Sequence, residues 1–513
     1  MKIAMTGVSG HFGIEALKQT LEIKEVEFVR VLLTCKKRND KLAKELIKTY
    51  GARVQIVRGS VAERDKCEKL VDGVDYAAHF AAVIPPASDA SHEGSEECNK
   101  RGTATLIDCV KKCKPQPKYI HISTVALYGN RNEKHPFGRV GDPLLVSSYD
   151  TYAMHKLYGE RYCLDAELDC FVVLRQSAML HPNMLNDNIS DGLMFHTALN
   201  APLEWVSARD SGYLIKRIFE RDMRGEIDAF WNNIYNIGAG KKGRCTGVDT
   251  FDLGFALIGG SAEKFLKPDW FALRNFHGMW FSDADELEEL FCYQRDGVED
   301  YWKEIGRQHK IFSLGKIVHP KLIEIFLFKR LLKHPNSPRR WLKDGDGVRV
   351  AASFGSVENA QNLSSDWKDY KLISRGDFGD YDKLRETSSA IALDHGYDES
   401  KKLCELTLED LKGAAAFRGG ETVSQDYDGN EYKKLEWKCA EGHIFKASPF
   451  TVLRGGHWCP DCCQPLPWKF GRVAKSSPFH AQVWYDSQSP DEDFVYDYNE
   501  EGHAAISGTE VKK

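Results

Sequence analysis

The chain has 513 residues, a formal net charge of −5 and a sequence pI near 6.4. At roughly 150 residues per domain, this length predicts two to four domains. The charge balance provides no basic field of the kind that attracts nucleic acid or an anionic membrane.

The start of the chain and its most apolar stretch both argue against a membrane protein. Lys2-Ile3-Ala4-Met5 follows Met1 and is typical of a buried strand, so no signal peptide is evident. Residues 311–332 are apolar but interrupted by charged residues, histidine and proline, which argues against a membrane span. We expect a cytoplasmic protein whose fourteen cysteines are reduced, with one cluster reserved for metal.

A glycine-rich turn follows the first predicted strand, residues 3–8, and precedes a predicted helix over 14–23. Strand, glycine turn and helix N-terminus in this order can cradle a pyrophosphate, because glycines admit it and the helix end offers N–H groups. The alternative is a structural turn. We predict that the turn binds a dinucleotide through Gly7, Ser9, Gly10, His11, Phe12 and Gly13.

Basic residues follow the second predicted strand, 27–33. Lys36, Lys37 and Arg38 stand where an NAD-selective site would place a carboxylate that binds the ribose. Cations at this place suit the 2'-phosphate of NADP, so NADP(H) is favoured over NAD(H). The alternative is that they begin the solvated helix predicted over 40–50.

Strands and helices continue to alternate along the next seventy residues. Strands are predicted over 54–57, 75–80 and 118–123, and helices over 63–71 and 93–112. This rhythm predicts an α/β fold with a doubly wound parallel sheet of the Rossmann type.

Tyr152 and Lys156 lie four residues apart in a further predicted helix, on the same face. An ammonium beside a phenol favours the phenolate, so Tyr152 could exchange a proton with a substrate oxygen near neutral pH. Chance alone could supply such a pair, and its interpretation depends on the neighbouring motifs.

Three further motifs have the order and spacing of a known family: His79-Phe80-Ala81-Ala82, Asn99-Lys100-Arg101-Gly102-Thr103 and Ser123-Thr124-Val125-Ala126-Leu127-Tyr128-Gly129. With them, residues 1–310 resemble an extended short-chain dehydrogenase/reductase of the NAD-dependent epimerase/dehydratase superfamily. The resemblance implies a Rossmann unit over 1–180, a substrate lobe over 181–310, and a homodimer that the added C-terminal half could obstruct.

The resemblance also implies roles for single residues. Thr124 would be the catalytic hydroxyl and Tyr152 the general acid/base. Lys156 would lower the pKa of Tyr152 and hold the nicotinamide ribose, and Asn99 would support the active-site helix and its water. Further cofactor contacts would come from Ser60, Ala81, Ala82, Tyr152, Lys156 and Gln176.

Departures from the family narrow the reaction. Val125 and Ala126 replace the Asp-Glu pair that sugar-nucleotide dehydratases need to eliminate water, which argues against dehydration. Glu204 stands where related enzymes often place a phosphate-binding arginine, and a carboxylate there would repel a pyrophosphate. We therefore expect an NADP(H)-dependent oxidoreductase acting on a carbinol or ketone of a small molecule.

Aromatic residues in the second half of the unit indicate an apolar or ring-shaped substrate, or else the core of the lobe. These are Trp205, Trp231, Trp270, Phe271, Phe276, Trp280 and Phe281. His277, before a glycine, marks a candidate substrate loop. The candidate substrate contacts are Val83, Val125, Ala126 and His277.

Two other functions stay open. One is a sugar or nucleotide-sugar epimerase that keeps NAD bound and returns the hydride to the opposite face. The other is a nicotinamide-sensing regulator that binds nucleic acid through its C-terminal module.

Beyond residue 310 the resemblance ends. Residues 311–342 predict a basic amphipathic connector, which is interpreted as an interdomain helix, a clasp for a partner subunit or a membrane-surface helix. Residues 343–412 are polar and predict little. Residues 413–513 form a module similar to a zinc ribbon, with a C-terminal tail.

Two knuckles about twenty residues apart predict a closed, structural Zn²⁺ site in this module. The ligands would be Cys439, His443, Cys459 and Cys462, with Cys463 and His457 as competitors. A closed shell of four ligands leaves no position for water, so the metal would not be catalytic.

The same module alternates basic and aromatic residues, as nucleic-acid surfaces do. The cations are Lys433, Lys434, Lys438, Lys446, Arg454, Lys469, Arg472 and Lys475, and the aromatics are Trp437, Trp458 and Trp468. Acidic residues dilute this field, so we favour a folding or assembly module. Residues 479–485 are expected to form a final strand or anchor.

Overall fold

The computed structural model describes residues 1–184, 191–310, 315–316, 318–373 and 392–507. Parts of the predicted lobe, connector, polar region and tail therefore lie outside the described residues. No helix among those described is both long and apolar enough to cross a membrane.

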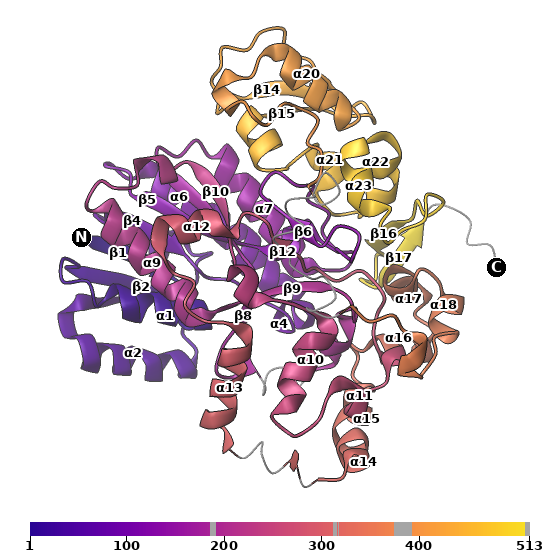
Figure 1. Cartoon of the computed structure of the whole chain (residues 1–513). Helices are drawn as coiled ribbons and strands as arrows, with labels where there is room; N and C mark the ends of the chain where they lie inside the picture. Colours follow the sequence, from indigo (N-terminus) through magenta and orange to yellow (C-terminus); the bar gives the residue numbers. More distant parts are fainter. Residues whose placement is uncertain (185–190, 311–314, 317, 374–391, 508–513) are drawn as a thin grey trace.

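A seven-stranded sheet forms the centre of the N-terminal unit (Figure 1). Its order is β10-β7-β5-β4-β1-β2-β3, and every neighbouring pair is parallel. This is the predicted Rossmann-type sheet. The strands are β1 (Lys2–Thr6), β2 (Phe28–Leu33), β3 (Val54–Arg58), β4 (Tyr76–His79), β5 (Lys118–Thr124), β7 (Phe171–Gln176) and β10 (Asn233–Ile237).

Helices cover both faces of this sheet because successive strand residues point to opposite sides. Ile3 and Met5 pack with α1 and α9 on one face, whereas Ala4 packs with α3 and α6 on the other. The helices are α1 (His11–Thr20), α2 (Lys37–Tyr50), α3 (Arg64–Val71), α6 (Thr103–Lys112), α7 (Thr151–Asp165) and α9 (Ala208–Asp222).

Two predicted helices differ from the structure in ways that concern the cofactor and the active site. The first helix begins at His11, three residues earlier than predicted, so Gly10 is its N-cap. The predicted helix 93–112 is divided into α5 (His92–Ser95), a π-helical segment η2 (Glu96–Gly102) and α6.

The substrate lobe adds short strands and helices beside the carboxyl edge of the sheet. Five of its seven noted aromatics are buried core, and only Trp205 and Phe276 remain half-buried. The elements are β8 (Ala178–Leu180), β9 (Pro202–Ser207), β11 (Arg244–Thr246), α10 (Gly247–Ala256) and α13 (Val298–Gln308), and a parallel pair of β6 (Phe137–Gly138) and β12 (Trp280–Phe281).

The connector packs on the lobe through one face. Phe328 and Leu331 are buried in a cluster with Trp270 and Phe271, as an interdomain helix requires. On the other face Phe326 is 76% exposed. The connector comprises α14 (Pro320–Ile323), η9 (Glu324–Phe328) and α15 (Lys329–Leu331), and it continues into α16 (Pro338–Asp344), α17 (Gly347–Phe354) and α18 (Val357–Gln361).

The C-terminal unit has its own core around Trp437, Trp458 and Trp468. This core also includes Leu393, Leu406 and Leu411, so packing with the unit begins before residue 413. Its elements are α20 (Leu408–Phe417), β13 (Glu421–Thr422), β14 (Leu435–Lys438), β15 (Ile444–Ala447), η13 (Phe450–Arg454), α21 (Pro460–Cys463), α22 (Phe470–Ser476), α23 (Pro478–Trp484), β16 (Val495–Tyr498) and β17 (Ala504–Ser507).

Of the two alternatives for residues 479–485, the strand is wrong, because residues 479–484 form most of helix α23; the anchor stays a prediction. Pro478 occupies the first turn, where its missing N–H costs nothing, and the Ser477 side chain accepts the His480 N–H. These two start signals outweigh the β propensity of the aromatic residues.

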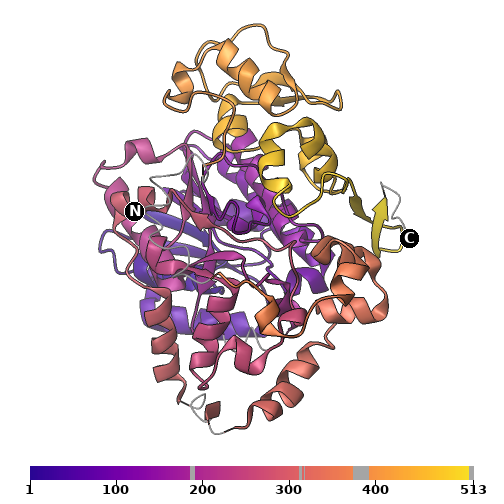
Figure 2. The ribbon, with the colours of Figure 1, turned by 45° about the vertical axis from the view of Figure 1, so that its right-hand side comes forward.

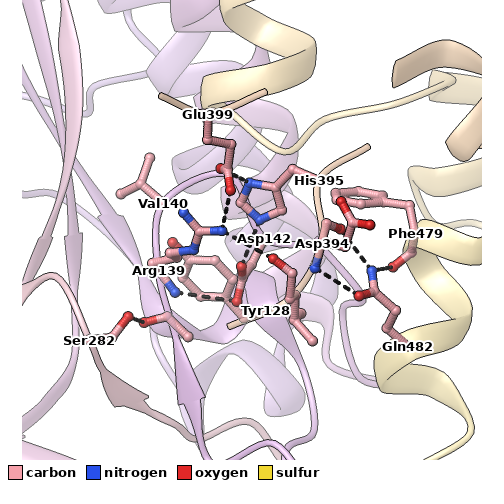
Figure 3. A network of polar contacts seen from close by, with 12 residues as sticks. Tyr128, Arg139, Val140, Asp142, Ser282, Asp394, His395, Glu399, Phe479 and Gln482 are labelled. Atoms are coloured by element: carbon pink, nitrogen blue, oxygen red, sulfur yellow. Dashed lines mark hydrogen bonds and ion pairs between the residues drawn. The ribbon is translucent and has the colours of Figure 1, made fainter. Parts of the chain in front are cut away.

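The C-terminal unit lies along the N-terminal unit from α7 to β6 and ends beside α17 (Figures 1 and 2). A buried ionic network joins the two units (Figure 3). His395 lies 3.0 Å from Asp142 and 2.6 Å from Glu399, whose other oxygen is 2.6 Å from Arg139. The two units are thus held together by charged groups taken out of water.

Candidate active site and metal centre

The glycine turn after β1 has the close backbone packing that a dinucleotide cradle requires. Gly7 has φ +70°, and a Cβ atom there would lie 2.4 Å from the Ala81 nitrogen. A Cβ on Gly13 would lie 2.4 Å from the Gly7 oxygen. Gly10 caps α1 without a side chain, so a phosphate can approach the helix end. The residues present therefore fit a pyrophosphate.

The carboxyl end of β2 carries the predicted cations. Lys36 is the N-cap of α2, and Lys36, Lys37 and Arg38 are all exposed. The next residue, Asn39, is buried, and its amide donates to Thr34. It therefore does not take the place of the carboxylate that binds the ribose in an NAD-selective site. This chemistry fits a 2'-phosphate.

Four further predicted cofactor contacts lie at or just after the ends of neighbouring strands. The Ser60 N–H donates to Glu63, and the Ala81 N–H donates to the Thr6 hydroxyl at 3.1 Å. Ala82 follows directly. Gln176 ends β7 beside Thr124, and its buried Oε1 has no hydrogen-bond partner in the described part of the chain. That oxygen is available as an acceptor for a bound group.

Thr124 and Tyr152 meet where β5 ends and α7 begins. A hydrogen bond with Thr124 lowers the pKa of the Tyr152 phenol, but burial dominates and raises that pKa to about 12. Lys156 lies one turn further along α7 and donates to the Ile122 carbonyl. Burial lowers the pKa of Lys156 to about 8. The low phenol pKa expected from Lys156 is thus not found here, because the ammonium is directed at a carbonyl and is itself desolvated.

Asn99 ties the π-helical segment to the loop after β4. Its Oδ1 accepts the Val83 N–H at 2.7 Å, and its Nδ2 donates to the Val83 oxygen and to Ser95. Ser95 contacts His155 of α7 at 3.1 Å. Asn99 is therefore placed to support α7, as the resemblance implies.

A cavity of about 580 Å³ opens beside Tyr152 and Thr124. Val125 and His277 line it, as predicted for substrate contacts, and so do Trp205 and Phe276. Ala126 and Val83 are not among the lining residues: Ala126 is fully buried with its N–H on Thr124, and the Val83 backbone is occupied by Asn99.

The loop that carries His277 is fixed to the start of α7. His277 Nδ1 lies 3.0 Å from Asp150, whose other oxygen accepts the Ala153 N–H and so caps α7. Asn275 accepts from and donates to the Ser148 backbone. His277 is thus held at the cavity wall by the same residue that begins the helix of Tyr152.

The carboxylate of Glu204 is not free to face a ligand. The expectation that it would repel a pyrophosphate is therefore corrected. It is buried, accepts the Gly240 and Phe281 N–H groups at 2.9 and 2.8 Å, and pairs with Arg244. Burial raises the pKa of Glu204 to about 7 despite Arg244. It holds the lobe together and does not exclude a phosphorylated ligand.

The sequence interpretation missed the cavity residues that follow position 310. Leu327, Phe328, Trp341 and Arg349 come from the connector and the polar region, and Tyr498 from the C-terminal hairpin. They lie far from Tyr152 in sequence, and the one signal was the amphipathic pattern of the connector.

The predicted metal ligands converge as a group of four. The ligand atoms of Cys439, His443, Cys459 and Cys462 all lie within 4.8 Å of one another. The Cys439 and Cys462 sulfurs are 3.7 Å apart, close to the ~3.8 Å that tetrahedral Zn–S bonds of about 2.3 Å imply. The soft donor set fits zinc.

The two competing ligands point elsewhere. His457 lies 3.1 Å from Glu160, and Cys463 contacts His480 at 3.7 Å. This leaves each knuckle with the two ligands predicted for it.

The nucleic-acid surface finds little support in the side chains. Trp437, Trp458 and Trp468 are buried, so they cannot stack on bases. Six of the eight cations named above form ion pairs: Lys433, Lys434, Lys438, Lys446, Arg454 and Lys475.

Comparison with known proteins covers the N-terminal unit. Residues 3–223 match the model of the NAD dependent epimerase/dehydratase family. The match spans β1 to α9, the part of the chain that forms the Rossmann-type sheet, except β10, and the helices on its faces.

Similar solved structures include a UDP-glucuronic acid 4-epimerase from Bacillus cereus with UDP-glucuronic acid and NAD, at 20% identity and TM-score 0.48, covering 61% of this chain and 100% of that one. A dTDP-glucose 4,6-dehydratase from Streptomyces venezuelae is 21% identical with TM-score 0.48, covering 61% and 97%. A UDP-glucose 4-epimerase from Bifidobacterium longum is 16% identical with TM-score 0.47, covering 62% and 100%.

Proposed function

We propose that the protein is an NADP(H)-dependent oxidoreductase that interconverts a carbinol and a ketone of a small, partly apolar molecule. The observation that carries this proposal is the Thr124–Tyr152 pair on the wall of a largely apolar cavity, with Lys156 one turn beyond. The nicotinamide, when bound, supplies or accepts the hydride.

The residues divide the remaining work among them. Tyr152 exchanges a proton with the substrate oxygen through its phenol, and Thr124 holds that oxygen by a hydrogen bond. Because burial keeps the phenol protonated at neutral pH, Tyr152 is suited to donate a proton when a ketone is reduced. Lys156 would hold the nicotinamide ribose when the cofactor is bound, and Asn99 positions α7 through Ser95 and His155.

The cofactor would lie across the glycine turn. Gly7, Gly10 and Gly13 provide the close approach to its pyrophosphate, with the N-terminus of α1 contributing N–H groups. Three exposed cations at the end of β2 support NADP(H) over NAD(H). A structural Zn²⁺ would be held by Cys439, His443, Cys459 and Cys462.

Replacing Tyr152 by phenylalanine tests this function. We expect Tyr152→Phe to lower kcat/KM for NADPH-dependent reduction of a panel of cyclic and aromatic ketones by roughly 10²- to 10⁴-fold. The Kd of NADPH, measured by fluorescence, should change little. Tyr158→Phe, on the same helix beside Lys100 and outside the cavity lining, is the matched control. Full activity in Tyr152→Phe would refute the proposal.

The family match of residues 3–223 favours a second candidate, an NAD-dependent sugar or nucleotide-sugar epimerase. An epimerase returns the hydride to its substrate, so the cofactor should remain bound through purification. Isomerisation of a sugar nucleotide with no net change in nicotinamide absorbance would establish this candidate over the first.

A further inference from the structure

The cavity beside Tyr152 has an apolar wall built from two parts of the chain. Phe251 and Phe255 of α10 form one side, and the connector residue Phe328 lies against Phe255 with ring centroids 5.7 Å apart. Trp205 and Trp302 extend this wall. An apolar ligand that contacts this wall gains binding free energy, because its apolar surface is removed from water.

The rest of the lining is polar and lies near the start of α7. His92 Nδ1 lies 3.1 Å from the hydroxyl of Thr151, the residue before Tyr152, and the His92 ring packs edge-on against Tyr498. Burial lowers the pKa of His92, and the nearby charge of Arg349 lowers it further. Arg349 lines the same cavity as His92 and Tyr152.

Two arginines line the cavity, and their side chains are engaged very differently. Arg274 donates to the Ala351, Ala352 and Ser487 carbonyls and forms a two-pronged ion pair with Glu492. For Arg349, the one carboxylate within ion-pair distance among the described residues is Asp346, at 3.7 Å.

Asp89 and Asp150 also line this end of the cavity, but neither forms an ion pair with Arg349 within the described chain. Asp150 is occupied by the α7 cap and by His277. Asp89 is held by Ser88 at 3.3 Å, and no ion pair joins it to Arg349 within the described chain. The Arg349 side chain is 36% exposed, so its guanidinium keeps donors available to a ligand in the cavity.

We infer that the substrate carries an anionic group, a carboxylate or a phosphate, that binds Arg349 while its apolar body contacts Phe251 and Phe255. A guanidinium matches the two oxygens of such a group with two parallel hydrogen bonds. This inference rests on the proposed function only in taking the cavity as the substrate site. The inference assigns a role in substrate selection to Arg349, a residue of the C-terminal half of the chain.

Two dyes with the same anilinonaphthalene body test the inference. 8-Anilinonaphthalene-1-sulfonate is an anion, whereas N-phenyl-1-naphthylamine is neutral. Each is titrated with the full-length protein in saturating NADP⁺, so that neither occupies the cofactor site. We expect Arg349→Met to raise the Kd of the anionic dye about tenfold or more, as loss of a charge-assisted hydrogen bond predicts, and to leave the neutral dye within about twofold.

Three further variants make the outcome specific. Arg349→Lys should restore part of the affinity for the anion. Arg340→Met, which removes an exposed arginine paired with Asp344 on the neighbouring helix α16, should change neither dye. Phe251→Ala should weaken both dyes if the body lies against α10. Unchanged binding of the neutral dye also shows that Arg349→Met is folded.

An unchanged Kd of the anionic dye in Arg349→Met, or equal losses for both dyes, would overturn the inference. Tyr152→Phe separates this result from the proposed function, because it should abolish reduction while leaving both dye affinities intact. If Tyr152→Phe stays active but Arg349→Met loses the anion, the oxidoreductase proposal fails and the anion site stands.

Discussion

Tyr152 is governed by two opposing influences within a few ångströms. Burial raises its pKa to about 12, and the hydrogen bond with Thr124 works in the other direction. The charge expected to dominate, that of Lys156, is instead directed at the Ile122 carbonyl. A ligand that drew the Lys156 ammonium from this carbonyl toward the phenol would lower the pKa of Tyr152.

The proposed preference for NADP(H) depends on three neighbouring residues, and replacing them tests it. Replacing Lys36, Lys37 and Arg38 together by serine should raise the Kd of NADPH by roughly tenfold or more, because each charge-assisted contact with a phosphate contributes about 1.5–3 kcal/mol. The Kd of NADH should barely move. Fluorescence titration of both cofactors provides the measurement.

Lys41→Ser is the control for this triple variant. Lys41 is exposed on the same helix, one turn further on, and pairs only weakly with Glu45 at 3.9 Å. An equal loss of affinity for NADH and NADPH in the triple variant would contradict a 2'-phosphate site.

Much of the candidate site could be predicted from residue identities, because the residues that form it lie close together in the sequence. Tyr152 and Lys156 share a helix, and the four metal ligands lie on two knuckles joined by β15. Glu204 was misinterpreted because its partner Arg244 lies forty residues away on a neighbouring strand. Such pairing across strands leaves no trace in the local pattern.

At the scale of elements, α7 is fixed by contacts from both ends. Asp150 caps its start, and one turn beyond Lys156 the buried Glu160 binds Ser123, Arg175 and His457. Burial alone would raise the pKa of Glu160, but Arg175 and His457 hold it well below its usual range. Since Arg175 also donates to the Gly455 oxygen at 2.6 Å, the second metal knuckle is joined to the catalytic helix.

Removing the metal should therefore loosen α7 as well as the C-terminal unit. We expect Cys462→Ser to abolish stoichiometric zinc, to lower the free energy of unfolding by about 3 kcal/mol or more, and to reduce hydride transfer. Zinc content, urea unfolding and initial rates measure the three effects.

The neighbouring cysteine provides the matched control. Cys463 is equally buried but lies outside the ligand group, against His480. Cys463→Ser should retain one zinc per chain and most of its activity. Full activity in zinc-free Cys462→Ser would show that the knuckle does not position α7.

Element types were predicted best where periodicity and flanking turns agree, as in the alternating strands and helices before residue 125. The start of α23 is signalled by Ser477 and Pro478, and these local signals were available but outweighed by the aromatic residues. The connector's role in the cavity could not be read from its sequence, because an amphipathic pattern does not name the surface that it covers.

At the scale of the whole molecule, the C-terminal half covers one side of helix α7. The outer side of α7 faces this half, and no residue of α7 is exposed. A homodimer remains a prediction, and its interface would have to use other surfaces.

The ionic network between the two units should give stability a distinct pH dependence. Burial alone would lower the pKa of His395, but Asp142 and Glu399 outweigh it and raise the pKa above its ordinary 6.5. A raised pKa contributes stability that is complete below 6.5 and is lost as the pH rises through the folded value. Glu399, with its pKa lowered to about 2, acts in the opposite sense: its contribution is complete above 4.5 and is lost as the pH falls.

We therefore expect the free energy of unfolding to decline as the pH rises from neutrality, and His395→Gln to remove most of that slope. Urea unfolding at a series of pH values measures it. His503→Gln is the control, because His503 has a side chain 76% exposed. A slope that persists unchanged in His395→Gln would exclude this network as its source.

The way in which the cavity wall is assembled has a consequence for the synthesis and folding of the protein. Its lining runs from Ile84 to Tyr498, so a growing polypeptide that has left the ribosome only as far as residue 310 contains Tyr152 but not the complete cavity. If Tyr152 acts as proposed, activity requires nearly all of the chain to have emerged and folded. A truncated translation product would contain Tyr152 without the cavity residues that are proposed to select the substrate.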